Sequence, residues 1–508
     1  MTFEQRPGQF QTPDAPAGAP DLRVAPDAAA GPPAGSRGTL PGPSAPRSTA
    51  DRLLIGLALV VVAALLLSVA GLVVVRELRN PHPVALASPA STIPAVVSTA
   101  PSAPPTAPSS ASPVEPSSAP SAAPSAGLTL AQQVAVIEAQ VPPLRQLQPR
   151  ASVPNRIVDQ ATAAAELQRE YDAANPAASV AAVQALWQHL GLLPAETDLR
   201  ALELQAQQSQ VLGFYDDSTR TMTVIQGSGG FGPLEQMTLA HEYTHALQDQ
   251  NFGLAKLQID TPDQTDRDLA RQALVEGDAT VTMTAWAVAH LTPDQLQQVA
   301  SSAGAPQSQA ELAALPPILQ SLLMFPYVDG ATFVGQLLQQ PGGWTAVDAA
   351  YRRPPNSTAQ ILHPELYLLH WQPVTLKLPD VAAELGAGWR MSDVDTLGEL
   401  MMRVWLAQAV DSATATDAAT GWAGDRIGGY QGPDGAWGVA WSTAWQNAAD
   451  ARRFESAADQ MIRHLATGGR VAAVLRFPTV SGSGGAREAV LIASSQAILS
   501  RLERILAP

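Results

Sequence analysis

The stretch LAHEYTHALQDQ, residues 239–250, places two histidines four positions apart, with a glutamate directly after the first. No proline interrupts it, and Glu242 is the one charged residue of the overlapping run TLAHEYTHAL. The stretch therefore predicts an uninterrupted helix in an apolar setting. Residues i and i+4 of a helix project from the same face, one turn apart. His241 and His245 can thus present two imidazole nitrogens to one metal ion.

Two interpretations of this helix are open. Two histidines bind zinc at about 2.0–2.1 Å, and a glutamate beside them can take a proton from a water at the metal. The alternative is an ordinary helix with core or surface histidines, because HExxH can arise by chance. The chain has only eight histidines, and the uncharged neighbours of the motif favour a metal site. We expect one Zn²⁺ per chain and Glu242 as the catalytic base.

A third protein ligand is expected on a second helix, which the apolar spacing predicts over residues 268–291. A catalytic zinc takes three protein ligands and keeps one position for water. Glu276 lies in the centre of this helix among apolar residues, where a carboxylate is costly unless it is paired. Asp278, on roughly the opposite face, is the alternative ligand; it could also orient a ligand histidine. We favour Glu276 and interpret the helix-weakening Gly277 as a point of close helix packing.

A β-hairpin is predicted directly before the metal helix. Residues 211–225, VLGFYDDSTRTMTVI, contain two β-rich runs around a turn-forming DDST. The next residues, GSGGFG at 227–232, match the GxGxxG fingerprint of dinucleotide-binding loops. That fingerprint is weak without a βαβ unit and a later acidic residue, and here the following helix carries HExxH. A loop leading into the helix is therefore favoured over a nucleotide site.

The C-terminal part of the chain predicts strands as well as helices. RVAAVLRF and EAVLIAS read as two strands joined by SGSGG, and QAILSRLERIL reads as a closing helix. WGVAWSTAW, with Trp437, Trp441 and Trp445, is interpreted as a strand packed in the core. An exposed aromatic strip for sugar or peptide contact is the alternative.

Several motifs together resemble a known group of enzymes. HEYTH, followed by a glutamate in a later helix, resembles the gluzincin zinc metallopeptidases. More narrowly, LAHEYTHALQDQNF, ALVEGDAT, RPPNSTAQILHPELY and GWAGDRIGGY resemble uncharacterised bacterial, membrane-anchored HExxH proteins regarded as metallopeptidases. The resemblance spans residues 130 to about 460. It implies a zinc held by His241, His245 and Glu276 and does not identify a substrate. The peptide or protein substrate that we expect follows from the peptidase activity of the gluzincin group.

The resemblance also implies how such a substrate is held. In gluzincins, a β-strand edge above the metal helix pairs with the extended substrate backbone, a form of strand addition. The matching element is the strand expected over residues 221–225. Thr221, Thr223 and Ile225 are therefore the candidate residues for substrate pairing.

Peptide hydrolysis further needs a hydrogen-bond donor for the oxyanion that develops on the scissile carbonyl. Four side chains in the resembling motifs and in FPYVDG are candidates: Tyr327, His363, Tyr367 and Arg426. Structural alternatives stand beside two of them. Pro364 after His363 suggests a turn, and Asp425 beside Arg426 could form an ion pair that fixes a loop.

The first quarter of the chain predicts three segments without a folded domain. Residues 1–50 are rich in Pro, Gly and Ala and predict a disordered tail. Residues 51–79 contain an uncharged, mostly branched apolar run at 53–75, long enough to cross a bilayer core of about 30 Å. Residues 80–127 predict a Pro/Ser/Ala-rich stalk with an extended backbone.

The apolar run is interpreted as the transmembrane helix of a single-pass membrane protein. A cleaved signal peptide is the alternative, but the run begins about 50 residues into the chain and is longer than a signal peptide's apolar core. A small excess of arginine before the run favours a cytoplasmic N-terminus. The folded domain is then expected outside the cytoplasm, at the cell membrane.

Charge and cysteine usage exclude several classes of function. The chain carries a net charge of −15, and Lys256 and Lys377 are its only lysines. This composition argues against nucleic acid or anionic lipid as a partner. The absence of cysteine excludes disulfides, thiolate metal sites and cysteine nucleophiles.

The predicted fold class is α+β, a mainly helical zincin-like domain with a small β-sheet over residues 128–508, whose α+β C-terminal part begins at about 420. The predicted function is that of a membrane-anchored zinc peptidase with Glu242 as general base. The alternative is a non-catalytic module of the same fold that binds cell-envelope peptides or glycans.

Overall fold

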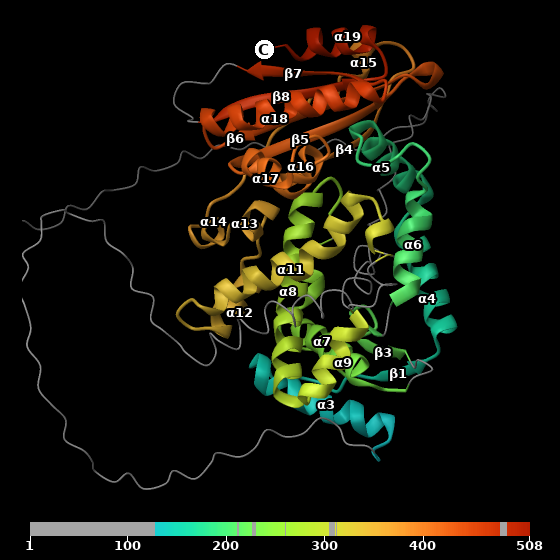
Figure 1. Cartoon of the computed structure of the whole chain (residues 1–508), viewed down its shortest axis with the longest axis vertical. Coiled ribbons are helices and arrows are strands. Elements are labelled where there is room, and N and C mark those ends of the chain that lie inside the picture. The colour runs from blue at the N-terminus through green and yellow to red at the C-terminus, as the bar shows by residue number, and fades with distance from the viewer. Residues whose placement is uncertain are drawn as a thin grey trace, which may run out of the picture. The chain divides into compact units, whose positions relative to one another are not determined.

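The computed structural model describes residues 127–210, 213–225, 230–259, 261–303, 310, 312–477 and 485–507 (Figure 1). Within these ranges the fold is mixed α+β and mainly helical, as predicted for the class. The predicted tail, transmembrane helix and stalk lie outside the described residues, except for Gly127, and so do residues 227–229 of the GxGxxG match. None of the helices in the described ranges combines the length and the apolar character that crossing a membrane requires.

Four helices and one short strand of the described residues precede the hairpin. They are α3 (Leu130–Arg145), β1 (Asn155–Val158), α4 (Gln160–Ala174), α5 (Ala177–Leu190) and α6 (Leu199–Gln210). The first of them, α3, begins at a reciprocal cap. The Gln132 backbone N–H donates to the Thr129 hydroxyl, and the Thr129 backbone N–H donates to Gln132 Oε1.

The hairpin prediction is confirmed by β2 (Gly213–Asp216) and β3 (Thr221–Ile225), which pair antiparallel. The turn between them is held by Asp216, whose Oδ1 accepts from the backbone N–H groups of Ser218 and Thr219. On its other side, β3 pairs in parallel with β1. The strand order is therefore β1-β3-β2, with β3 in the middle.

The helix that carries HExxH and two further long helices form the centre of the N-terminal part. They are α7 (Pro233–Phe252), α8 (Thr265–His290) and α11 (Pro317–Leu338), with η1 (Leu254–Leu257) and α9 (Pro293–Ala303) between them in the chain. The start of α7 is capped by Glu235, which accepts from the Gly232 N–H, and Pro233 fills the first turn. The predicted second helix, 268–291, agrees with α8.

Helices α8 and α11 make close backbone contact where two glycines meet. A Cβ atom placed on Gly277 of α8 would lie 2.2 Å from the carbonyl carbon of Gly330 in α11. A Cβ atom on Gly330 would lie 2.2 Å from the Ala273 carbonyl oxygen. The interpretation of Gly277 as a point of close helix packing is confirmed. This contact fixes the spacing of the two helices beside Glu276.

Replacing Gly277 by alanine is expected to destabilise the fold by about 1–3 kcal/mol, because the new methyl group must push two backbones apart. The matched control is Gly335→Ala in α11, where no heavy atom lies within 4 Å of the added Cβ. That control should be neutral or stabilising by up to about 1 kcal/mol. Thermal unfolding of the two variants measures the difference, and equal stabilities would contradict the packing argument.

The C-terminal part begins with short helices and ends in a five-stranded sheet. Its elements are α12 (Trp344–Arg352), α13 (Thr358–Leu362), α14 (Pro364–Leu368), α15 (Ala382–Leu385), β4 (Arg390–Asp395), α16 (Gly398–Leu406), α17 (Ser412–Ala419), β5 (Trp422–Gln431), η2 (Pro433–Gly435), β6 (Trp437–Trp445), α18 (Ala448–Thr467), β7 (Val471–Phe477), β8 (Ala486–Ala493) and α19 (Gln496–Leu506). The strands pair antiparallel in the order β4-β5-β6-β8-β7.

This sheet confirms the predicted strands at its end and starts earlier than predicted. β7, β8 and α19 match the two expected strands and the closing helix. The first strand begins at Arg390, ahead of residue 420, because RMSDVD is a polar edge strand without an apolar strand pattern. Trp441 and Trp445 are fully buried, as predicted for a core strand, and the half-buried Trp437 stacks on His189.

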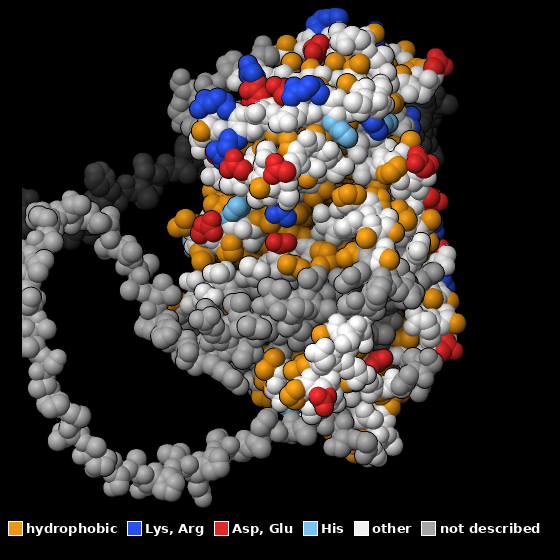
Figure 2. Space-filling model, in the orientation of Figure 1, with side chains coloured by type: hydrophobic (Ala, Val, Ile, Leu, Met, Phe, Trp, Pro, Cys, Tyr) orange, Lys and Arg blue, Asp and Glu red, His pale blue; other side chains and the backbone are white. Residues whose placement is uncertain are grey.

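The surface over the C-terminal elements carries charges of both signs. On the face shown in Figure 2, the coloured Lys and Arg side chains in this region are interspersed with Asp and Glu. Such a mixture produces no large field of one sign on that face.

Candidate metal centre

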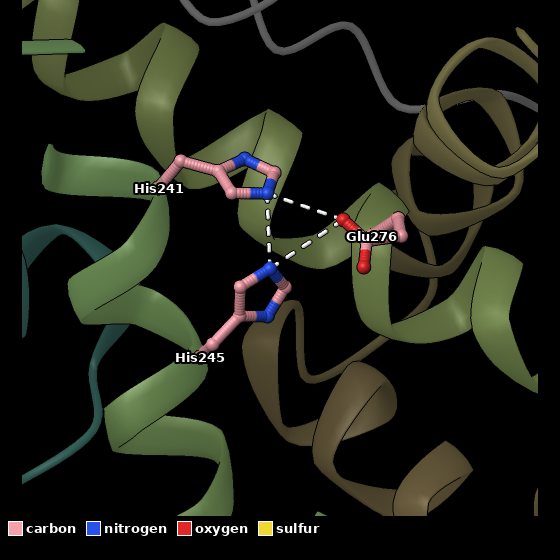
Figure 3. A group of neighbouring side chains, drawn as sticks. All are labelled: His241, His245 and Glu276. Atoms are coloured by element: carbon pink, nitrogen blue, oxygen red, sulfur yellow. Dashed lines mark hydrogen bonds and ion pairs between the residues drawn. The ribbon is translucent and has the colours of Figure 1, made fainter. Parts of the chain in front are cut away.

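Side chains from α7 and α8 converge on one point in the interior of the protein (Figure 3). The Nε2 atoms of His241 and His245 lie 3.0 Å apart. The Glu276 Oε2 atom lies 3.1 Å from His241 Nε2 and 3.4 Å from His245 Nε2. Within the described ranges this is the one group of three metal-ligating side chains, here called the His–His–Glu cluster.

The distances of the cluster fit a metal ion. Two ligand atoms that are each 2.0–2.1 Å from a tetrahedral zinc lie about 3.3 Å apart. The three observed separations bracket that value. Two imidazole nitrogens and a carboxylate oxygen are also a donor set that zinc accepts. The structure therefore brings together the three side chains predicted as ligands, and they could hold a metal ion.

Burial and mutual contact set the charges of the cluster. Burial opposes ionisation of Glu276, but the adjacent His245 and His241 outweigh it and lower the Glu276 pKa to about 2. Burial likewise opposes the charged form of His245, but Glu276 and Glu242 raise its pKa to about 9. Burial lowers the pKa of His241 to about 4. The metal-free cluster thus holds one proton between its ligands, and a metal ion would displace it.

Glu242 lies beside the cluster with one carboxylate oxygen available. Its Oε2 accepts from the backbone N–H of Tyr215 at 2.9 Å. Its Oε1 is buried and has no hydrogen-bond partner among the described residues. Burial raises the pKa of Glu242 to about 7. A carboxylate with this pKa and an unpaired oxygen is suited to accept a proton near neutral pH.

The strand beside Glu242 is β2, and the prediction of a substrate-pairing edge at β3 is wrong. Thr221, Thr223 and Ile225 lie on β3, whose backbone is paired on one side with β1 and on the other with β2. The parallel strand β1 comes from far away in the sequence, so the hairpin alone did not reveal it. The Tyr215 N–H points away from β3 toward Glu242. Among the described strands, β2 has β3 as its one neighbour, so β2 is the edge next to α7.

Tyr327 is the one oxyanion candidate that the structure brings to the cluster. It lies on α11, is buried, and its ring centre is 6.2 Å from that of His241. Its hydroxyl bonds to Glu276, and burial together with that carboxylate raises the pKa of Tyr327 well above its ordinary value. Tyr327 therefore braces the candidate ligand Glu276.

Two other oxyanion candidates are held by groups outside the cluster. His363 Nε2 lies 2.7 Å from Oε1 of the buried Glu399, a hydrogen bond that raises the pKa of His363. The Tyr367 hydroxyl donates to the backbone carbonyl of Arg353 at 2.9 Å. Both side chains fasten the short helices α13 and α14, in line with the structural alternative for His363.

Arg426, the last candidate, also serves the packing of loops. It donates to the backbone carbonyl of Asp263 at 2.7 Å and lies 3.6 Å from the Asp263 carboxylate. The ion pair considered between Asp425 and Arg426 is not what fixes this region. Instead Asp425 accepts from the backbone N–H groups of Leu397 and Gly398 at the start of α16.

A glutamine holds the far side of His245, and the sequence analysis missed it. Gln248 Oε1 lies 2.9 Å from His245 Nδ1. Gln248 Nε2 donates to the Val275 carbonyl at 3.0 Å and to Asp278 Oδ2 at 3.1 Å. The signal available in the sequence was its position three residues after His245, on the same face of an apolar helix. Asp278 therefore reaches His245 through Gln248, and Glu276 occupies the ligand position.

A groove of about 140 Å³ runs along the first half of α8. Its lining includes Val183 and Trp187 of α5, Leu322 of α11 and Gln272 of α8. Gln272 precedes Glu276 by one helical turn on the same face. The lining of the groove thus comes within one helical turn of Glu276 along α8, and no residue of the cluster is part of it.

Comparison with known proteins covers a different part of the chain. A family model described as a domain of unknown function, DUF8575, matches residues 387–496. No curated protein and no solved structure matches the chain. The matched segment contains the strands β4 to β8 with α16, α17 and α18, whereas the His–His–Glu cluster lies on α7 and α8. The arguments for the cluster consequently rest on its own geometry and on the motifs of the sequence.

Proposed function

We propose that the protein is a zinc-dependent peptidase in which His241, His245 and Glu276 hold the metal and Glu242 is the general base. The observation that carries this proposal is the convergence of the cluster beside a buried glutamate with an unpaired oxygen. A bound Zn²⁺ would supply a Lewis acid that polarises the scissile carbonyl and acidifies a water. The resemblance to gluzincins, and hence a zincin-like fold for the domain, belongs to the same proposal.

The chain's own residues then perform the proton transfers. The Tyr215 N–H holds Glu242 Oε2, which leaves Oε1 to take a proton from the attacking water. Glu242 passes that proton to the leaving amine as the peptide bond breaks. Burial raises the pKa of the Glu242 carboxyl group, and this desolvation favours its taking up a proton when the water attacks.

The substrate in this proposal is an extended peptide or protein segment. β2 is the edge strand next to the catalytic helix, and an extended chain can add to the backbone groups of such an edge other than the Tyr215 N–H, which Glu242 holds. The groove along α8 is lined by eight apolar and seven polar side chains, with Asp268 and Glu203 among the polar ones. It therefore suits substrate side chains that combine an apolar part with a polar group.

The location in the proposal is the cell membrane, with the peptidase domain outside the cytoplasm. The apolar run at residues 53–75 would anchor it, and the Pro/Ser/Ala-rich segment would hold the domain away from the bilayer. A topology reporter fused after Pro508 tests this arrangement. Reporter activity in the cytoplasm would contradict it.

The central test uses the full chain purified in mild detergent. We expect about one zinc per chain and cleavage of members of a broad peptide library, with cleavage abolished by a chelator and restored by Zn²⁺. Metal analysis and mass spectrometry of the digest give the two readings. A chain that carries no zinc and takes up none would sink the proposal. Stoichiometric zinc without cleavage would favour the alternative, a binding module of the same fold.

A further inference from the structure

Gln248 is a buried polar residue whose three hydrogen bonds all serve the metal centre. It is fully buried on α7, one turn after His245. Its amide faces an imidazole on one side and two oxygen acceptors on the other. The two acceptors are the Val275 carbonyl and the Asp278 carboxylate, both on α8.

These partners determine the orientation of the amide. Only the NH₂ group can donate to two oxygen acceptors, so Gln248 Nε2 must face Val275 and Asp278. The carbonyl Oε1 then accepts from His245, which places a hydrogen on His245 Nδ1. With this hydrogen fixed on Nδ1, the proton that a metal ion would displace is the one on Nε2, the atom that faces His241 and Glu276.

Asp278 is held in turn by side chains from two other helices. Its Oδ1 accepts from Arg145 Nε at 2.6 Å, and its Oδ2 accepts from the Tyr351 hydroxyl at 2.7 Å. Arg145 and Asp278 are both fully buried. The Arg145 guanidinium also lies over the Trp344 ring, 4.3 Å from its centre. A rigid chain of contacts therefore runs from α3 and α12 to His245.

We infer that Gln248 and Asp278 are positioning residues. They orient His245 and thereby raise the affinity of the cluster for zinc, and Arg145 of α3 anchors them. This inference rests on the proposed function, because it presumes that the cluster binds metal. Outer partners of this kind fix the tautomer and direction of a ligand histidine, and their loss weakens metal binding about 10–100-fold. The hydrogen bonds from Arg145 through Asp278 and Gln248 to His245 are here called the relay. Through the relay, α3, the first described helix, helps to support the metal centre.

The test measures zinc affinity by competition with a chromophoric chelator, together with the visible absorption of the Co²⁺-loaded full chain. Gln248→Met keeps the side-chain length and removes the amide, and we expect its Kd for zinc to rise about 10–100-fold with an altered Co²⁺ spectrum. The matched control is Gln236→Met, a buried glutamine on the same helix that bonds to the Phe231 carbonyl. The control should keep the wild-type Kd and spectrum.

Two further variants test whether Asp278 acts through Gln248. As a single change, Asp278→Asn should raise the Kd for zinc. In the Gln248→Met background it should raise the Kd little further, because the relay is already broken there. Gln248→Glu combined with Asp278→Asn exchanges donor and acceptor between the two side chains but leaves the Val275 carbonyl without its donor, so it should recover part of the affinity lost in Gln248→Glu. This pair also covers the case in which Gln248→Met does not fold.

The outcomes separate the inference from the proposed function. The inference is wrong if Gln248→Met keeps the wild-type Kd for zinc, or if the effects of the Gln248 and Asp278 changes are fully additive. Neither result would contradict the proposed metal site. A wild-type chain that binds no zinc would overturn the proposed function itself.

Discussion

Under the proposed peptidase function, replacing Glu242 by glutamine is expected to lower the turnover number at least about a hundredfold, since a general base contributes about 10²–10⁴ to the rate. Glutamine has the same shape, and its carbonyl can still accept from the Tyr215 N–H. It cannot take a proton from water, however. The zinc content should stay at one per chain, because Glu242 is not a ligand. The turnover number is measured on a library peptide that the wild type cleaves, and the zinc content is measured by metal analysis of the same sample.

The control for this substitution is Glu235→Gln on the same helix. Glu235 accepts from the Gly232 N–H at the start of α7 and belongs to the helix cap. Its variant should retain wild-type turnover within about threefold, because a cap contributes about 1 kcal/mol to stability and does not touch the cluster. Full activity in Glu242→Gln would remove Glu242 from the role of base and leave the zinc assignment intact.

Replacing Glu276 by glutamine is expected to raise the Kd for zinc by more than a hundredfold. The change removes a charged ligand, so its effect should exceed the roughly 10–100-fold effect of losing an outer partner. Activity should fall in parallel at limiting zinc and recover in part at high zinc. Chelator competition and a zinc titration of turnover measure the two effects.

The same variant should show a pH-dependent loss of stability without metal. The folded pKa of Glu276, about 2, lies below its ordinary 4.5, so its contacts contribute stability above pH 4.5 that is lost as the pH falls toward 2. The folded pKa of His245, about 9, lies above its ordinary 6.5, so its contribution is full below pH 6.5 and is lost as the pH rises through 9. The deficit of Glu276→Gln in unfolding temperature should therefore be largest between pH 4.5 and 6.5.

Glu399→Gln is the matched control for Glu276. Glu399 is also buried and also bonds to a histidine, His363, but neither residue belongs to the cluster. This variant can lose stability, yet it should keep wild-type zinc affinity. If Glu276→Gln instead kept wild-type affinity, the third ligand would be a different residue.

Local patterns in the sequence predicted much of the fold around the centre. The β-hairpin, α7 and α8 follow from apolar spacing and turn residues within short windows. These patterns did not predict that β2, and not β3, is the edge strand next to α7. The reason is that β1 pairs with β3 from a segment more than sixty residues earlier. The early start of the C-terminal sheet was missed for a related reason, since the polar strand β4 is defined by its pairing with β5.

The sequence by itself determined which side chains could share a helix face. His241 and His245 lie one turn apart because of helix periodicity, and that relation holds wherever α7 packs. Only the tertiary structure decided which groups meet that face. It selected Glu276 over Asp278, placed Tyr327 and not His363 against the ligands, and brought Arg145 from α3 to the outer side of His245. Those choices depend on packing between helices far apart in the chain, where backbone contacts such as Gly277 on Gly330 set the spacing.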